Sequence, residues 1–146
     1  MTKTIQTWQF DYKVTLVLES TQDHLLLALN TGIARFMIDT GKLDWLVDVE
    51  KGINDRCNDG ACDSQGRLWV GTMHRQQEQV AGSLHCFDAN LVVNKKIDKV
   101  SISNGIAWSS DNKRLYYIDS PTQKIQSFQF DEHSGDYYMP YVLNIV

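Results

Sequence analysis

Short apolar runs separated by polar turn residues recur along the chain, and apolar residues at helical spacing are rare. Three pairs of such runs stand out, residues 25–29 with 33–39, 67–71 with 82–88, and 114–119 with 124–131. Runs of about four to eight β-favouring residues bounded by Gly, Pro, Asn or Asp are typical of strands. Each pair therefore predicts a β-hairpin, and the chain as a whole is predicted to be all-β.

The predicted hairpins belong to a sequence repeat. The second run of each hairpin ends in an apolar residue followed by aspartate, at Asp39, Asp88 and Asp131, with spacings of 49 and 43 residues. A second repeat, NDGACDSQGRLWVGT and SNGIAWSSDNKRLYYID, precedes two hairpins and aligns Gly60 with Gly105. A hairpin repeat of about 40–50 residues is typical of the four-stranded blades of a β-propeller. A β-sandwich with similar hairpins is the alternative that the periodicity leaves open.

Blades of this kind stack face to face. The apolar face of the first run of each hairpin is therefore expected to belong to the core. Trp69, Trp108, Tyr116 and Phe128 are assigned to the same core, in preference to a ligand-binding platform. At about 45 residues per blade, the 146 residues correspond to roughly three blades. We therefore expect residues 1–146 to form a single domain.

Composition and charge exclude several classes of protein. The formal net charge is −4, whereas nucleic-acid binding requires a clustered basic face. No apolar run approaches the roughly 18–20 residues of a membrane span, and the first residues lack an apolar signal-peptide core. No membrane partner and a cytoplasmic location are therefore expected. The odd cysteine count, Cys57, Cys62 and Cys86, favours reduced, buried thiols, and a zinc site formed with His74 or His85 is the weaker alternative.

Polar residues suited to metal and sugar binding cluster just before a predicted strand. Arg56, Asn58 and Asp59 offer a forked donor, an amide and a carboxylate, and Asn104 holds the place of Asn58 in the next repeat. Corresponding loops of neighbouring blades converge on a central channel, so Asn58 and Asn104 are expected to face a common site. Amide oxygens can ligate hard divalent cations. Asn-Asp-Gly and Asn-Gly are also common turn sequences, and spacing alone favours turns here.

Three segments carry a family resemblance. RCNDGACDSQGRLWVGTM and SNGIAWSSDNKRLYYIDSPTQKIQSFQFD resemble two hallmarks of the senescence marker protein/regucalcin/gluconolactonase family. LLLALNTGIARFMIDTGKLDWLVDVE resembles the family segment just upstream, in the right order, so that the resemblance covers residues 7–142. It implies a six-bladed β-propeller with one divalent metal in its channel. Residues 1–146 would then be a partial β-propeller domain of about three blades, a half-propeller.

The resemblance also implies roles for single residues. Asn104 corresponds to a metal ligand, and Arg56 and Asn58 correspond to residues that bind substrate. Gln76 falls where some animal members have a substrate-contacting glutamate, and Asp59 is a weak candidate for a catalytic base. The implied activity is hydrolysis of sugar lactones or related esters with Ca²⁺, Zn²⁺ or Mn²⁺. The cation polarises the carbonyl and lowers the pKa of a bound water, and a carboxylate acts as general base.

Two departures from the family pattern affect this expectation. The family's other metal ligands, a glutamate in Glu-Gly-Pro and an aspartate in Pro-Asp-Gly, have no match in this chain. One amide oxygen cannot hold a divalent cation tightly, because such sites take about six or more oxygen ligands. A lone chain is therefore predicted to be a poor lactonase. The alternatives are a non-catalytic half-propeller that serves as a binding scaffold, and a calcium-binding regulatory protein.

A half-propeller leaves two blade faces without a neighbouring blade. Exposed apolar surface of this extent favours association, and two-fold dimers are the commonest oligomers. We therefore predict a homodimer in which two copies close one ring, with a small sugar lactone as the substrate partner.

Overall fold

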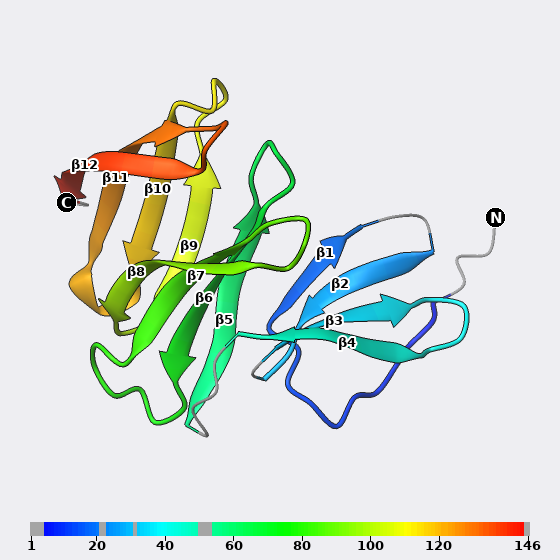
Figure 1. The fold of residues 1–146 in the computed structure, drawn as a ribbon. Coiled ribbons are helices and arrows are strands. Elements are labelled where there is room, and N and C mark those ends of the chain that lie inside the picture. The colour runs from blue at the N-terminus through cyan, green and yellow to red at the C-terminus, as the bar shows by residue number, and fades with distance from the viewer. Residues whose placement is uncertain (1–4, 21–22, 31, 50–53, 145–146) are drawn as a thin grey trace.

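The computed structural model describes residues 5–20, 23–30, 32–49 and 54–144, and these form three four-stranded antiparallel sheets (Figure 1). The strands of each sheet follow one another in the order of the sequence. The first sheet holds β1 (Leu16–Glu19), β2 (His24–Ala28), β3 (Gly32–Met37) and β4 (Leu43–Asp48). The second holds β5 (Asp55–Cys62), β6 (Leu68–His74), β7 (Gly82–Phe87) and β8 (Val93–Val100). The third holds β9 (Ser103–Trp108), β10 (Arg114–Asp119), β11 (Lys124–Asp131) and β12 (Asp136–Asn144), with a helical turn η1 (Ser120–Thr122) after β10.

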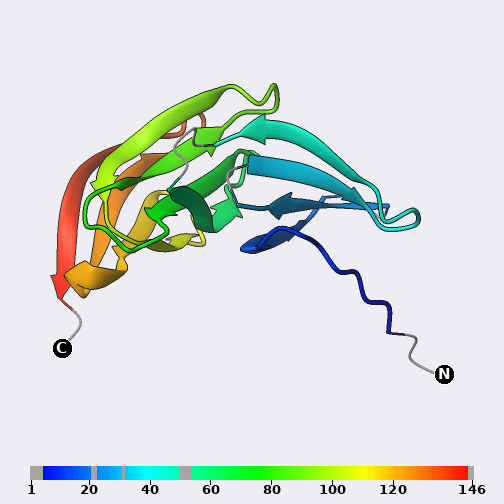
Figure 2. The ribbon, with the colours of Figure 1, turned by 90° about the horizontal axis from the view of Figure 1, so that it is seen from below.

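The three predicted hairpins are confirmed as the central strand pairs of the three sheets. They are β2–β3, β6–β7 and β10–β11, all antiparallel. The first strands of the sheets lie toward one another, because β5 contacts both β1 and β9. Figure 2 shows the second sheet between the other two, with the first and third sheets at opposite ends of the molecule. This is the arrangement of a partial β-propeller with one sheet per blade.

The core consists of layers between and beside the sheets. The layer between the second and third sheets contains Trp69, Leu84, Cys86, Val100, Leu115, Tyr117, Phe128 and Phe130. The layer between the first and second sheets contains Ala28, Ile33, Val49, Cys57, Leu68, Val70 and Phe87. A third layer, on the outer face of the first sheet, is covered by Trp8, Phe10 and Val14, which precede β1. No helix within the described ranges is long and apolar enough to cross a membrane.

Most of the predicted core residues are buried, and one assignment is wrong. Trp69 and Phe128 are buried and Trp108 is partly buried. Tyr116 is only half-buried, whereas the next residue, Tyr117, is fully buried. Successive side chains of a strand point to opposite faces, so the RLYYID run turns Tyr117 toward the second sheet and Tyr116 toward the outer face of the third.

The cysteines follow the prediction in part. Cys57 and Cys86 are buried, Cys62 is exposed, and no disulfide joins these three described residues. Burial raises the pKa of the Cys86 thiol to about 11. A thiol with so high a pKa stays protonated and unreactive near neutral pH.

A buried aspartate links the second sheet to the third. Asp63 Oδ1 accepts hydrogen bonds from the backbone N–H groups of Gln65 and Arg67, each at 3.0 Å. Its Oδ2 accepts from Arg67 Nε at 2.6 Å and from Trp69 Nε1 at 3.0 Å. The two terminal nitrogens of Arg67 donate to the backbone carbonyls of Glu132 and His133 in the β11–β12 turn. Asp63 therefore orients an arginine that ties two blades together.

Candidate functional site

The predicted site residues Asn58 and Asp59 lie in a β-bulge of β5. Cys57 pairs with Thr72 and Gly60 pairs with Val70, so Asn58 and Asp59 together oppose a single residue of β6. A bulge of this kind bends the strand and changes the direction of its side chains. The expectation of a turn at this sequence is therefore wrong, because the segment lies inside a strand.

The first strand of the third sheet carries a matching bulge. Ser103 pairs with Asp119 and Ile106 pairs with Tyr117, so Asn104 and Gly105 oppose Ile118 alone. Gly105 has a φ of 78°, which glycine adopts without steric cost. The two bulges align Asn58 with Asn104, as the repeat predicts. In this structural alignment Gly105 corresponds to Asp59. The sequence repeat aligned Gly105 with Gly60, so that alignment is wrong by one residue.

Hydrogen bonds between the two bulges hold the backbone on both sides of Asn104. Asn58 Nδ2 donates to the Ser103 carbonyl at 2.8 Å, and the Gly105 N–H donates to Asp59 Oδ2 at 2.7 Å. Arg56 Nη1 in turn donates to Asn58 Oδ1 at 3.0 Å. Arg56 therefore orients Asn58, and Asn58 and Asp59 position the backbone on either side of Asn104.

The third sheet supports the same segment from its other side. Asn104 Nδ2 donates to Ser120 Oγ at 3.2 Å, and the side chain is exposed. The two carboxylate oxygens of Asp119 accept from the backbone N–H groups of Ser101 and Ile102, at 3.1 and 2.8 Å. Both amides belong to the segment that immediately precedes β9.

Ser103 is a positioning residue that the sequence did not reveal. Its hydroxyl accepts a hydrogen bond of 2.7 Å from the hydroxyl of Tyr117, and both side chains are buried. Burial raises the pKa of Tyr117 well above its usual value, so this hydroxyl remains a donor across the physiological pH range. The only sequence signal was the alternation of side-chain direction along RLYYID. This run is too short to indicate Ser103 as the partner of Tyr117.

Gln76 is the fifth predicted site residue. It follows β6, and its backbone N–H contacts His74 Nδ1 at 3.4 Å. No hydrogen bond joins its side chain to Arg56, Asn58 or Asn104 in the part of the chain that the structure describes. His74 is buried at the end of β6, with Nε2 4.0 Å from Glu78.

The donor set near Asn104 does not complete a site for a divalent cation. Both oxygens of Asp119 and Oδ2 of Asp59 accept backbone amides. Among the described residues, no group of three or more His, Cys, Asp or Glu side chains is placed to hold a metal ion. Such an ion takes about six or more oxygen ligands. These residues alone therefore do not fit such an ion.

Comparisons with known proteins agree with the architecture. A family model described as "SMP-30/Gluconolactonase/LRE-like region" matches residues 1–143. The chain is 33% identical to YvrE of Bacillus subtilis (strain 168), described as a candidate sugar lactone lactonase, over 90% of this chain and 46% of that protein. It is also 33% identical to the regucalcin of Oryctolagus cuniculus, over 92% of this chain and 47% of the relative.

A solved structure supports the same relationship. The crystal structure of a calcium-binding protein, regucalcin, from Agrobacterium tumefaciens matches with a TM-score of 0.83 and 26% identity. The match covers 92% of this chain and 45% of that one. The chain therefore spans about half the length of these relatives.

Proposed function

The chain belongs to the SMP-30/gluconolactonase/LRE-like family, and from that premise we propose that it acts in the hydrolysis of sugar lactones or related esters. The observation that supports this proposal most directly is the pair of matched bulges, in which Arg56 bonds Asn58 and Asn58 bonds the backbone next to Asn104. A guanidinium donates hydrogen bonds, and an amide both donates and accepts them, so the two groups together suit sugar hydroxyls and a lactone carbonyl. The description of YvrE as a candidate sugar lactone lactonase agrees with this substrate class.

Each polar residue has a distinct part in this proposal. Arg56 uses Nη1 to orient Asn58 and keeps its other N–H groups for the substrate. Asn104 presents Oδ1, because its Nδ2 is bonded to Ser120. Asp59 acts by positioning Gly105 and therefore Asn104, and we do not assign it the role of general base. Holding the reacting groups in place supplies much of the rate of such reactions.

A divalent cation, Ca²⁺, Zn²⁺ or Mn²⁺, is part of the proposal. When bound, it would polarise the ester carbonyl and activate water, and Asn104 would be one of its ligands. The described residues do not supply a complete ligand set. We therefore expect slow hydrolysis by a lone chain.

Replacing Asn104 with alanine tests this proposal. Titration calorimetry with Ca²⁺, Zn²⁺ and Mn²⁺ is combined with a gluconolactone hydrolysis assay in the presence of each ion. We expect Asn104→Ala to weaken ion binding and to lower kcat/KM by at least about tenfold, since loss of even an outer-shell partner of a metal costs about 10–100-fold.

Asn94→Ala, at an exposed position of β8, is the matched control and should behave as the wild type. Equal activity of Asn104→Ala and wild type would refute the assignment of the site. A wild-type chain that neither binds the ions nor hydrolyses the lactone would favour the binding-scaffold alternative.

We also propose that the chain forms a homodimer through the outer face of the third sheet. Ile118 and Ile125, a cross-strand pair, lie half-buried beside Tyr116, and Tyr141 is exposed. The outer face of the first sheet already packs against Trp8 and Phe10. A two-fold contact between two third sheets is therefore favoured over the ring closure expected from the sequence, which needs the first sheet to be uncovered.

Sedimentation equilibrium measures the mass that this proposal predicts. Wild type should show about twice the 16.7 kDa of one chain, and Tyr141→Glu should shift the equilibrium toward monomer because it places a charge in the apolar contact. Val17→Glu, at an exposed position of β1, is the control and should remain dimeric. A wild-type protein that stays monomeric at high concentration would refute the dimer.

A further inference from the structure

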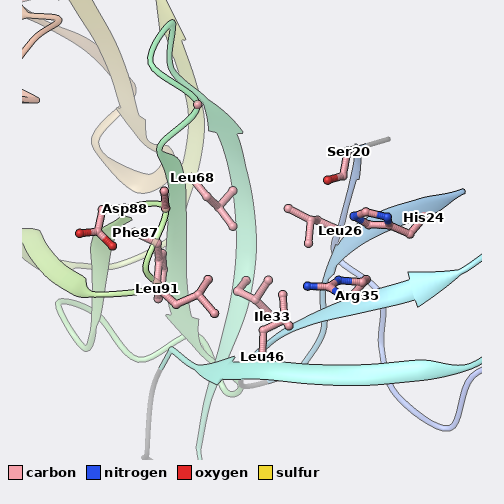
Figure 3. A pocket seen from close by; sticks show the side chains of 12 residues that line it. Ser20, His24, Leu26, Ile33, Arg35, Leu46, Leu68, Phe87, Asp88 and Leu91 are labelled. Carbon is pink, nitrogen blue, oxygen red and sulfur yellow. The ribbon is translucent and has the colours of Figure 1, made fainter. Parts of the chain in front are cut away.

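A cavity of about 240 Å³ lies between the first and second sheets, away from the bulges of β5 and β9 (Figure 3). Apolar side chains from both sheets line it, namely Leu26, Ile33, Leu46, Leu68, Phe87 and Leu91. Figure 3 shows these side chains facing one another across the gap between β2–β4 and the strands of the second sheet. None of the residues assigned to the lactone site lines this cavity.

The neighbouring interface shows what normally fills such a gap. Between the second and third sheets, the rings of Trp69, Trp108 and Phe130 pack against one another with centroid distances of 5.8 to 6.0 Å. Phe130 and Phe87 hold corresponding positions, since each immediately precedes the repeated aspartate. Across the cavity from Phe87, the first sheet contributes the aliphatic residues Leu26, Ile33 and Leu46. One interface is therefore filled with aromatic rings, while the other keeps an apolar space.

A positive charge lies at the edge of this space. Arg35 and His24 line the cavity from the first sheet, and Figure 3 shows the guanidinium of Arg35 directed into the gap. Arg67, at the filled interface, is paired with Asp63, whereas no ion pair of Arg35 occurs among the residues that the structure describes. Asp88 also borders the cavity, but its Oδ1 accepts the backbone amides of Asn90 and Val92, and its side chain points away.

Leu91 forms part of the cavity wall, and its backbone has an uncommon conformation. Leu91 has a φ of 61°, an uncommon conformation for a leucine, within the turn that Asp88 organises. The side chain points into the cavity (Figure 3) and remains 36% exposed. Strained residues of this kind are found at ligand sites more often than elsewhere.

We propose that this cavity binds a small carboxylate whose apolar body is about the size of one aromatic ring. The ring packs against Phe87, Leu26 and Leu91, in the space that aromatic side chains fill at the next interface. The carboxylate pairs with the Arg35 guanidinium, which matches it in geometry and charge. The volume agrees with this class, because a cavity of roughly 150 Å³ holds benzene and drug-sized ligands occupy about 300 Å³ or more.

Three probes with the same ring and different head groups test the proposal. Phenylacetate, 2-phenylethanol and 2-phenylethylamine are titrated into the whole chain by calorimetry. We expect phenylacetate to bind with a Kd near or below about 1 mM, and the alcohol and the amine to bind at least about tenfold more weakly. This ranking does not depend on lactone hydrolysis, so its outcome is separate from that of the proposed function.

Variants locate the binding. Arg35→Gln should weaken phenylacetate binding by about tenfold or more, and Leu26→Phe should abolish it by filling the cavity while keeping the protein folded. Arg114→Gln is the matched control, because Arg114 lies in another hollow, beside Tyr116 and Tyr141 on the third sheet. Equal affinity for the three probes, or unchanged binding by Arg35→Gln, would overturn the proposal.

Discussion

Replacing Asp63 with alanine is expected to lower the free energy of unfolding by about 3–5 kcal/mol, the usual cost of removing one partner of a buried ion pair. The carboxylate is 0% exposed and accepts four hydrogen bonds, two from Arg67, one from Trp69 and one from Gln65. Its loss leaves the Trp69 N–H buried without a partner and frees the guanidinium of Arg67 from its orientation. Urea unfolding followed by tryptophan fluorescence measures the change.

Asp131→Ala is the matched control for this experiment. Asp131 also accepts backbone amides within a turn, from His133 and Ser134, and these bonds lower the pKa of its carboxyl below the usual value. Its side chain is exposed, so water replaces the lost interactions and the destabilisation should be far smaller. A loss of less than about 1 kcal/mol for Asp63→Ala would contradict the view that this aspartate holds the second and third blades together.

The central hairpins could be predicted from the sequence because their physical cause is local. LLLAL, RLWVG and RLYYID are short apolar runs with polar turn residues on either side, and they form β2, β6 and β10. Some outer strands carry no such signal. β8 has the sequence VNKKIDKV. It is largely exposed because it is an edge strand of its sheet. The packing of Trp8 and Phe10 on Phe36 joins residues far apart in the chain and follows from no local pattern.

The correspondence between Asn58 and Asn104 was predictable from the sequence, and the geometry around them was not. The repeat pairs Asn58 with Asn104, and the two lie at the same position of two matched bulges. The sequence favoured turns because Asn, Asp and Gly have the same backbone preferences in bulges and in turns. The cross-blade bonds to Ser103 and Gly105 depend on how the second sheet packs against the third. That packing is tertiary, so residue spacing alone could not reveal it.

Gly71 lies close to the third blade, beside the segment that carries Asn104. A Cβ atom at this position would come within 1.9 Å of Ser103 Oγ and 2.4 Å of Ser103 Cβ. Ser103 cannot readily yield, because its hydroxyl is bonded to Tyr117 and its carbonyl to Asn58. An alanine at position 71 must therefore either push the two blades apart or displace Ser103.

Gly71→Ala is therefore expected to cost about 3 kcal/mol of unfolding free energy, the upper range for overpacking a close-packed interior. Because Ser103 precedes Asn104, the side-chain amide resonances of Asn104 should shift as well. The double variant Gly71→Ala with Ser103→Gly removes both clashing atoms and should be more stable than the sum of the single changes predicts. Gly66→Ala is the control, because its Cβ meets nothing within 4 Å at a φ of +76°, and it should cost only about 1 kcal/mol. Additive single and double variants would show that the Gly71–Ser103 approach does not constrain the site.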